Sequence, residues 1–198
     1  MTIIFFVNSK TVNIDNYNIK NIPGSSGRLD VISRCVLATI IGSDGFDKNI
    51  QIWIFLGRYG TFIFNPDLFN FESFPKNELQ FTDYFVRFLQ KYHNGKDKSL
   101  NPLNQIQYSK MNIVEAIKYF QKFKYGFYVL FEKGQDFFKL LHSIQEKENI
   151  VFIIGSQEDE YIYSKELLAL KLPMISIGNQ SYLASSVIRL LKLYIMAL

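Results

Sequence analysis

The chain has 198 residues, of which 48% are hydrophobic and 20% charged, and its formal net charge at pH 7 is +4. This composition excludes a disordered chain, supplies the core of a single domain, and permits an RNA partner without requiring one. The single cysteine, Cys35, excludes an internal disulfide and suits the cytoplasm, and two isolated histidines, His93 and His142, give no metal-ligand spacing.

The first half of the chain is predicted to begin with an apolar strand at 3–7, which has no signal-peptide features. A Gly-rich turn and a helix at 30–42 follow a polar connection. Strands at 50–56 and 61–64 face each other across a short loop with two glycines, which is typical of a hairpin. A helix at about 78–92 carries a stripe of phenylalanines, and such a stripe is usually buried in a core.

The second half alternates helices and strands after a polar segment at 94–108 that we expect to be a surface loop or a short disordered linker. The predicted helices are 112–122, 136–146, 160–170 and 181–197, and the predicted strands are 127–131, 150–154 and 174–177. This alternation favours an α/β domain with a mostly parallel sheet, spanning 1–198 without a break. The last helix is apolar on most sides but short for a membrane span. We expect it in a core or a subunit interface, and we expect no membrane association.

The segment Ile22-Pro-Gly-Ser-Ser-Gly-Arg-Leu-Asp30 joins the Gly-rich turn to the helix at 30–42. Glycines free the backbone for tight turns, and apolar residues recur at helical spacing after them. Arg28 and Asp30 therefore lie where a helix begins. There a guanidinium can hold a phosphate and a carboxylate can accept a proton. A plainer interpretation has Asp30 capping the helix and Arg28 in solvent.

Three predicted strands of the second half end in segments that contain glycine, namely Leu130–Asp136, Ile154–Asp159 and Ser176–Ser181. Ligands of open α/β sheets collect at the carboxyl ends of the strands. Each segment taken alone also fits an ordinary strand-to-helix turn. The sequence contains no dinucleotide fingerprint and no P-loop, and no arrangement of Ser, His and Asp suggests a nucleophile.

Taken together, these segments resemble the archaeal tRNA pseudouridine-54 N1-methyltransferases, the TrmY group of the SPOUT class. The most specific block is Gly27-Arg-Leu-Asp30, followed by Arg34-Cys35. At 130–136 the family reads Leu-His-x-x-Gly-Glu-Asp, and this chain has Phe131 and Gln135 in place of His and Glu. The similarity continues through Val151-Phe-Ile-Ile-Gly155 and the last strand and helix, so that it is colinear over nearly the whole chain.

The resemblance implies S-adenosylmethionine as cofactor and a C-terminal trefoil knot, with the knot and the cofactor loops within about 126–198. It implies that the cofactor is bound by backbone atoms and apolar side chains of three loops, at Leu130, Gly134, Gly155, Ser176, Ile177, Gly178, Leu183 and Val187. No metal is needed.

The resemblance also implies a homodimer that packs through the C-terminal helix and binds tRNA across the two subunits. N1 of pseudouridine would attack the methyl group. Arg28 would contact the substrate, and Asp30 would act as the base that removes the N1 proton.

Several positions depart from the family pattern. The family motif Gly-Asp-His-x-Gly is replaced by Gly155-Ser-Gln-Glu-Asp159, a His-Ala-Asn-His-Cys motif by Leu183-Ala-Ser-Ser-Val187, and a Pro-Asp-Glu-Arg segment by Pro75-Lys-Asn-Glu78. These changes leave three alternatives open besides tRNA methylation. They are a ribosomal RNA pseudouridine methyltransferase, a knotted RNA-binding protein without transfer activity, and a plain oligomeric α/β protein.

Overall fold

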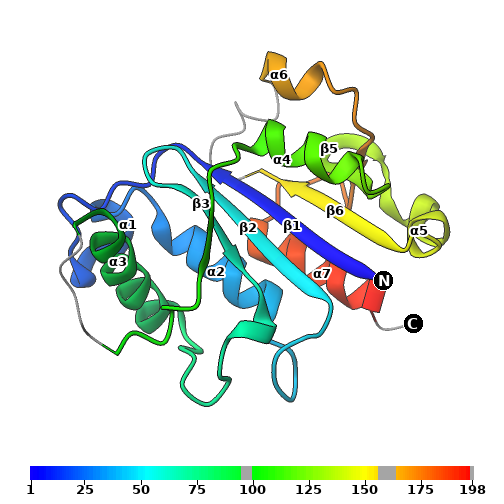
Figure 1. The fold of residues 1–198 in the computed structure, drawn as a ribbon. Coiled ribbons are helices and arrows are strands. Elements are labelled where there is room, and N and C mark those ends of the chain that lie inside the picture. Colours follow the sequence, from blue (N-terminus) through cyan, green and yellow to red (C-terminus); the bar gives the residue numbers. More distant parts are fainter. Residues whose placement is uncertain (95–99, 156–163, 197–198) are drawn as a thin grey trace.

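A seven-stranded sheet forms the centre of the molecule (Figure 1). The computed structural model describes residues 1–94, 100–155 and 164–196. The strand order is β4-β3-β2-β1-β6-β5-β7. The strands are β1 Thr2–Ser9, β2 Ile50–Leu56, β3 Gly60–Phe64, β4 Gln107–Ser109, β5 Gly126–Asp136, β6 Asn149–Ile154 and β7 Met174–Ser176.

The sheet is mostly parallel, as predicted. β1 pairs in parallel with β2 and β6, and β5 pairs in parallel with β6 and β7. β3 and β4 extend one edge in antiparallel pairing, with β2 and β3 forming the predicted hairpin. The carboxyl ends of five parallel strands therefore lie along one edge of the sheet.

The helices cover the two faces of this sheet in two layers. They are α1 Ile22–Ser25, α2 Leu29–Ile40, α3 Glu78–Asn94, α4 Ile113–Gln121, α5 Phe137–Gln145, α6 Lys165–Leu168 and α7 Ala184–Met196. Side chains alternate between the faces of a strand. Accordingly Phe5 packs into a cluster with α2, α3, α5 and α7, while Phe6 packs with α4 and α6. Figure 1 shows α2 and α7 side by side behind the sheet and α4 in front of it.

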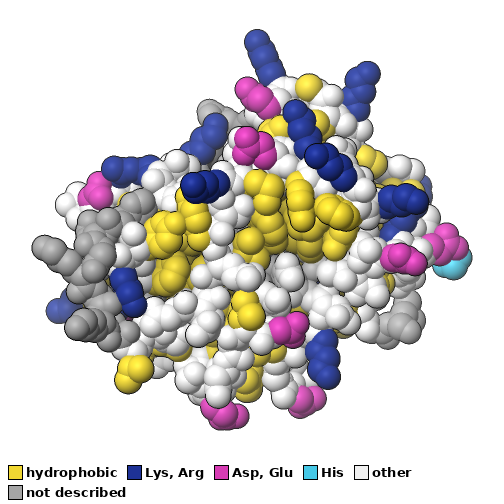
Figure 2. Space-filling model, viewed as in Figure 1, with side chains coloured by type: hydrophobic (Ala, Val, Ile, Leu, Met, Phe, Trp, Pro, Cys, Tyr) yellow, Lys and Arg dark blue, Asp and Glu magenta, His cyan; other side chains and the backbone are white. Residues whose placement is uncertain are grey.

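The surface on the α4 side combines apolar and basic groups (Figure 2). Hydrophobic side chains gather near the centre of this view, and Lys or Arg side chains border them. Tyr119 and Phe123 are exposed, with ring centroids 5.0 Å apart, between the exposed Lys118, Lys122 and Lys124. Exposed rings among lysines are typical of surfaces that meet nucleic acid.

The prediction of a surface loop over 94–108 was wrong for its second half. Residues 95–99 lie outside the described residues. Leu103 is fully buried in the main core, and Asn101 Nδ2 donates to the Tyr84 carbonyl at 2.7 Å. Strand β4 begins at Gln107 and was not predicted, because three residues are too few to show a period. The predicted helix 160–170 is described only from residue 164, where α6 occupies Lys165–Leu168.

A buried lysine joins α7 to the end of α2. Lys192 is 9% exposed, and its Nζ donates to the carbonyls of Ala38 at 2.8 Å and Thr39 at 2.7 Å, and to that of Ile41 at 3.2 Å. It also forms an ion pair with Asp47. Burial lowers the pKa of Lys192, and its hydrogen bond to Asp47 acts in the opposite direction. The ammonium group therefore satisfies helix-end carbonyls that α2 itself leaves without partners.

Among the described helices, none combines the length and the apolar character that crossing a membrane requires.

We expect Lys192→Met to lower the free energy of unfolding by about 1–3 kcal/mol, because it leaves the α2 carbonyls and Asp47 without their donor. Urea denaturation measures this change. Lys139→Met, at an exposed position of α5, is the matched control and should have little effect. Equal stability of the Lys192→Met variant and the native protein would show that the Lys192 hydrogen bonds do not stabilise the packing of α7 against α2.

Candidate functional site

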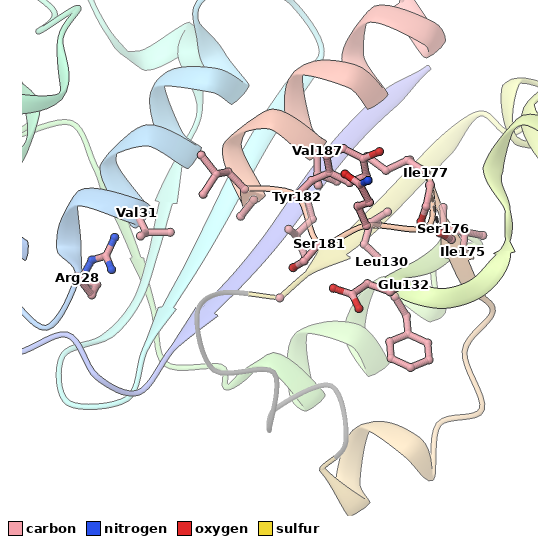
Figure 3. Close-up of a pocket in the computed structure, with 17 residues that line it drawn as sticks. Arg28, Val31, Leu130, Glu132, Ile175, Ser176, Ile177, Ser181, Tyr182 and Val187 are labelled. Atoms are coloured by element: carbon pink, nitrogen blue, oxygen red, sulfur yellow. Dashed lines mark hydrogen bonds between the residues drawn. The ribbon is translucent and has the colours of Figure 1, made fainter.

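A pocket of about 260 Å³ opens beside residues 130–132 of β5 and the ends of β6 and β7 (Figure 3). The end of β6 contributes Ile154 and Gly155, and the end of β7 leads into Ser176, Ile177 and Gly178. The first turn of α7 and the loop before it add residues 180–184 and 187. The first turn of α2 forms the opposite side. The site therefore lies at the strand ends, where ligands of open α/β sheets bind.

Seven of the eight residues that the resemblance implied for the cofactor line this pocket, namely Leu130, Gly155, Ser176, Ile177, Gly178, Leu183 and Val187. The structure thus brings together residues that are up to 57 positions apart, from Leu130 to Val187. The Ser176 side chain shapes the last of the three loops, since its Oγ donates to the Gly178 carbonyl at 2.6 Å. The lining also includes Val31, Glu132 and Tyr182, which the sequence did not single out.

Gly134 is the exception, because it faces the neighbouring backbone and not the pocket. A Cβ at this position would lie 2.6 Å from the backbone nitrogen and carbonyl carbon of Ile175. The pairing of β5 with β7 is irregular here, since Leu130 and Gln135 both pair with Ile175. Residues 131–134 therefore leave the regular ladder, Phe131 and Glu132 line the pocket, and only glycine fits at the close approach.

The turn before α2 holds Arg28 in an uncommon conformation. Gly27 has φ of 58°, and a Cβ there would lie 1.9 Å from the Thr11 carbonyl oxygen. The Thr11 hydroxyl donates to the Gly27 carbonyl at 3.0 Å. Arg28 follows with φ of 66°, in the left-handed region that few non-glycine residues adopt. The Gly-rich segment thus aims the Arg28 side chain at the pocket, whose lining includes it.

Asp30 lies beneath Arg28, with its side chain only 4% exposed. Its Oδ1 accepts from Arg28 Nε at 3.0 Å, and its Oδ2 accepts from Arg28 Nη2 at 3.1 Å and from Arg34 Nη2 at 2.8 Å. The hydrogen bond to Asp30 raises the pKa of the Arg28 guanidinium. The plainer interpretation of Asp30 as a helix cap was wrong, because Arg28 is the N-cap residue of α2 and makes no side-chain cap bond.

Two charged side chains border the pocket from different sides. Figure 3 shows Arg28 and Val31 at the α2 end, and Glu132 with Leu130 at the β5 side. Asp30 is not part of the lining. In the described part of the chain no group of three His, Cys, Asp or Glu side chains could hold a metal ion.

Comparison with known proteins assigns the chain to a family. Residues 1–196 match the model of the family described as "Putative SAM-dependent RNA methyltransferase". The chain belongs to this RNA methyltransferase family. The match covers nearly the whole chain and confirms the resemblance found in the sequence.

Relatives of this methyltransferase carry a more specific name. The tRNA (pseudouridine(54)-N(1))-methyltransferase of Thermococcus onnurineus is 27% identical over 189 residues, which cover 91% of this chain and 89% of the relative. The protein of the same name from Pyrococcus abyssi is 26% identical over 209 residues, covering 97% of this chain and 96% of the relative.

A solved structure shares the fold of this methyltransferase. The crystal structure of Archaeoglobus fulgidus Nep1 bound to S-adenosylhomocysteine matches with a TM-score of 0.66 and 14% sequence identity, covering 100% of this chain and 98% of that chain. This likeness confirms the predicted α/β fold of the SPOUT class. The trefoil knot stays a prediction.

We expect Gly134→Ala to weaken S-adenosylmethionine binding by about tenfold or more, equivalent to about 1.4 kcal/mol. The added methyl group cannot fit against Ile175, so the backbone of residues 131–134 or of Ile175 must shift, and both segments contribute to the pocket lining. Calorimetric titration measures the affinity. Gly126→Ala is the matched control at the start of the same strand, where the nearest atom to the new Cβ is 3.5 Å away. Unchanged affinity in both variants would contradict this account of the wall.

Proposed function

We propose that this protein transfers a methyl group from S-adenosylmethionine to N1 of a pseudouridine in the T-loop of tRNA. The observation that carries the proposal is the pocket beside the middle of β5 and the ends of β6 and β7, lined by seven of the predicted cofactor residues. The family match supports the reaction class, and the names of the relatives supply the nucleotide. The lysines and exposed rings around α4, together with the net charge of +4, suit an RNA partner in the cytoplasm.

The residues of the pocket fit the cofactor. Leu130, Ile177 and Val187 offer apolar surface to an adenine ring, and the glycines at 155 and 178 leave backbone groups open to a ligand. When bound, S-adenosylmethionine supplies an electrophilic methyl group attached to a positively charged sulfur. We also propose the trefoil knot. The resemblance to the SPOUT class, which implies a C-terminal trefoil knot, supports it.

Arg28 is the proposed substrate contact. Asp30 engages its Nε and Nη2, and in the described part of the chain no hydrogen bond to its Nη1 is found. The Nη1 group can therefore donate to a carbonyl or phosphate oxygen of the substrate, in an orientation fixed by the carboxylate. Asp30 acts through Arg28 in this proposal. Its predicted role as the base would require its carboxylate to release a guanidinium first.

We propose in addition that two copies pair through α7. Leu193, Tyr194 and Met196 are exposed on this helix, and Leu193 keeps 59% of its surface in contact with solvent. Phe138 of α5 extends the same surface, with its ring 4.9 Å from that of Tyr194. A contiguous apolar face of this kind is typical of subunit interfaces.

The oligomeric state tests the pairing. We expect the protein to sediment as a dimer and Leu193→Glu to sediment as a folded monomer, since a buried unpaired charge would oppose association. Phe123→Glu, which alters an exposed ring outside α7, should remain dimeric. A native protein that sediments as a monomer would refute the proposed interface.

The cofactor and Arg28 can be tested together. We expect one S-adenosylmethionine per chain with micromolar affinity, on the order of −8 kcal/mol, and methyl transfer to tRNA transcripts containing pseudouridine. Arg28→Lys should lower the transfer rate by about 100-fold while leaving cofactor affinity nearly intact, because lysine cannot keep the paired geometry with Asp30. Arg58→Ala, which removes an exposed ion pair with Asp15, is the control.

Two of the alternatives predict different results. Absence of cofactor binding would favour an RNA-binding protein without transfer activity. The substitutions that motivate this alternative at Ser156 and Gln157 lie outside the described residues. Cofactor binding with transfer to ribosomal RNA and not to tRNA would favour the ribosomal RNA enzyme.

A further inference from the structure

Glu132 is a carboxylate placed on the wall of the pocket. Among the described residues that line the pocket it is the only carboxylate, and Arg28 is the only other charged side chain. Figure 3 shows its carboxylate pointing into the pocket, toward Ser181. The resemblance did not assign this position, because the family motif allows any residue there.

The Glu132 side chain is available to a ligand. It is exposed, and in the described part of the chain no hydrogen bond or ion pair to its carboxylate is found. Its backbone is nevertheless held in place. Glu132 belongs to the short excursion of β5 between Leu130 and Gln135, both of which pair with Ile175, and the close contact of Gly134 with Ile175 fixes the excursion from the other end.

Asp30 differs from Glu132 in each of these respects. It is almost fully buried, its oxygens accept from two guanidinium groups, and it is absent from the pocket lining. A base must come within hydrogen-bond reach of the proton that it removes. Glu132 lines the pocket with an unengaged carboxylate, whereas the Asp30 carboxylate would first have to release a guanidinium group.

We propose that Glu132 is the base that accepts the N1 proton of the target pseudouridine. This inference rests on the proposed function and names a further catalytic residue for it. The nitrogen gains a bond to the methyl carbon while the carbon–sulfur bond breaks and leaves its electron pair on sulfur. The N1–H bond breaks as well, its electron pair stays on nitrogen, and the proton passes to a Glu132 oxygen. Arg28, from the other end of the pocket, would stabilise the negative charge that the ring carbonyls gain as the proton leaves.

The test compares Glu132→Gln and Glu132→Ala with the native protein. We expect Glu132→Gln to lower kcat on a pseudouridine-containing tRNA transcript by about 100-fold or more, the effect of removing a general base. The acid limb of its pH–rate profile should disappear. Calorimetric dissociation constants for S-adenosylmethionine and S-adenosylhomocysteine should stay unchanged, which also shows that the variant is folded. Added formate should restore part of the rate of Glu132→Ala, where the missing carboxylate leaves room for it, and none of the rate of Glu132→Gln.

A matched control is Glu146→Gln, which changes an exposed carboxylate at the end of α5 and should keep the native rate. The proposal is overturned if Glu132→Gln retains the native kcat. It is also overturned if the variant loses affinity for S-adenosylmethionine but not for S-adenosylhomocysteine, because Glu132 would then recognise the positive sulfur. No transfer by the native protein overturns the proposed function and this inference together. Equal transfer by native and Glu132→Gln proteins overturns the inference alone.

Discussion

The pairing of Ile175 with two residues of the same strand is the constraint on which the site depends. Leu130 and Gln135 both meet Ile175, so the chain between them must leave the ladder within four residues. The excursion creates a wall beside the ends of β6 and β7. It also demands glycine at 134, where the two backbones approach too closely for any side chain. The position of Glu132 is a consequence of this path, because the residue lies within the excursion and not in the regular strand.

The opposite wall depends on α2. Its first turn presents Arg28, which Gly27 and the buried Asp30 hold in place, and its last turn is fastened to α7 by Lys192. α7 begins beside the pocket with Leu183, Ala184 and Val187. One end of each helix therefore lines the site, while Lys192 joins the two helices away from it. The packing of these helices sets the separation between Arg28 and the walls formed by the strands.

Local patterns predicted most of the fold, and the family resemblance predicted much of the site. The boundaries of β1, β2, β3 and β6 follow from apolar runs and the hairpin loop. The seven pocket residues came from the resemblance to the methyltransferase family, which the Gly-Arg-Leu-Asp block and the later segments carry. The errors fall where local pattern has no information. The segment after residue 100 is polar in sequence, yet Leu103 fills a gap in the core, and β4 is too short to show a period. Glu132 was missed because a single exposed glutamate after a strand carries no signal of its own.

The sequence by itself determined the order of the strands and helices along the chain apart from β4, the mostly parallel sheet, and the Gly-rich turn that precedes α2. Hydrophobic periodicity and backbone freedom act over a few residues and can therefore be read from the chain. Only the tertiary structure decided the partners of each charge. In the folded protein Asp30 is buried under Arg28 and Arg34, and Gly134 contacts the Ile175 backbone instead of lining the pocket. Glu132 faces the pocket. These outcomes depend on contacts between residues far apart in the chain, and local sequence spacing does not encode the distances between them.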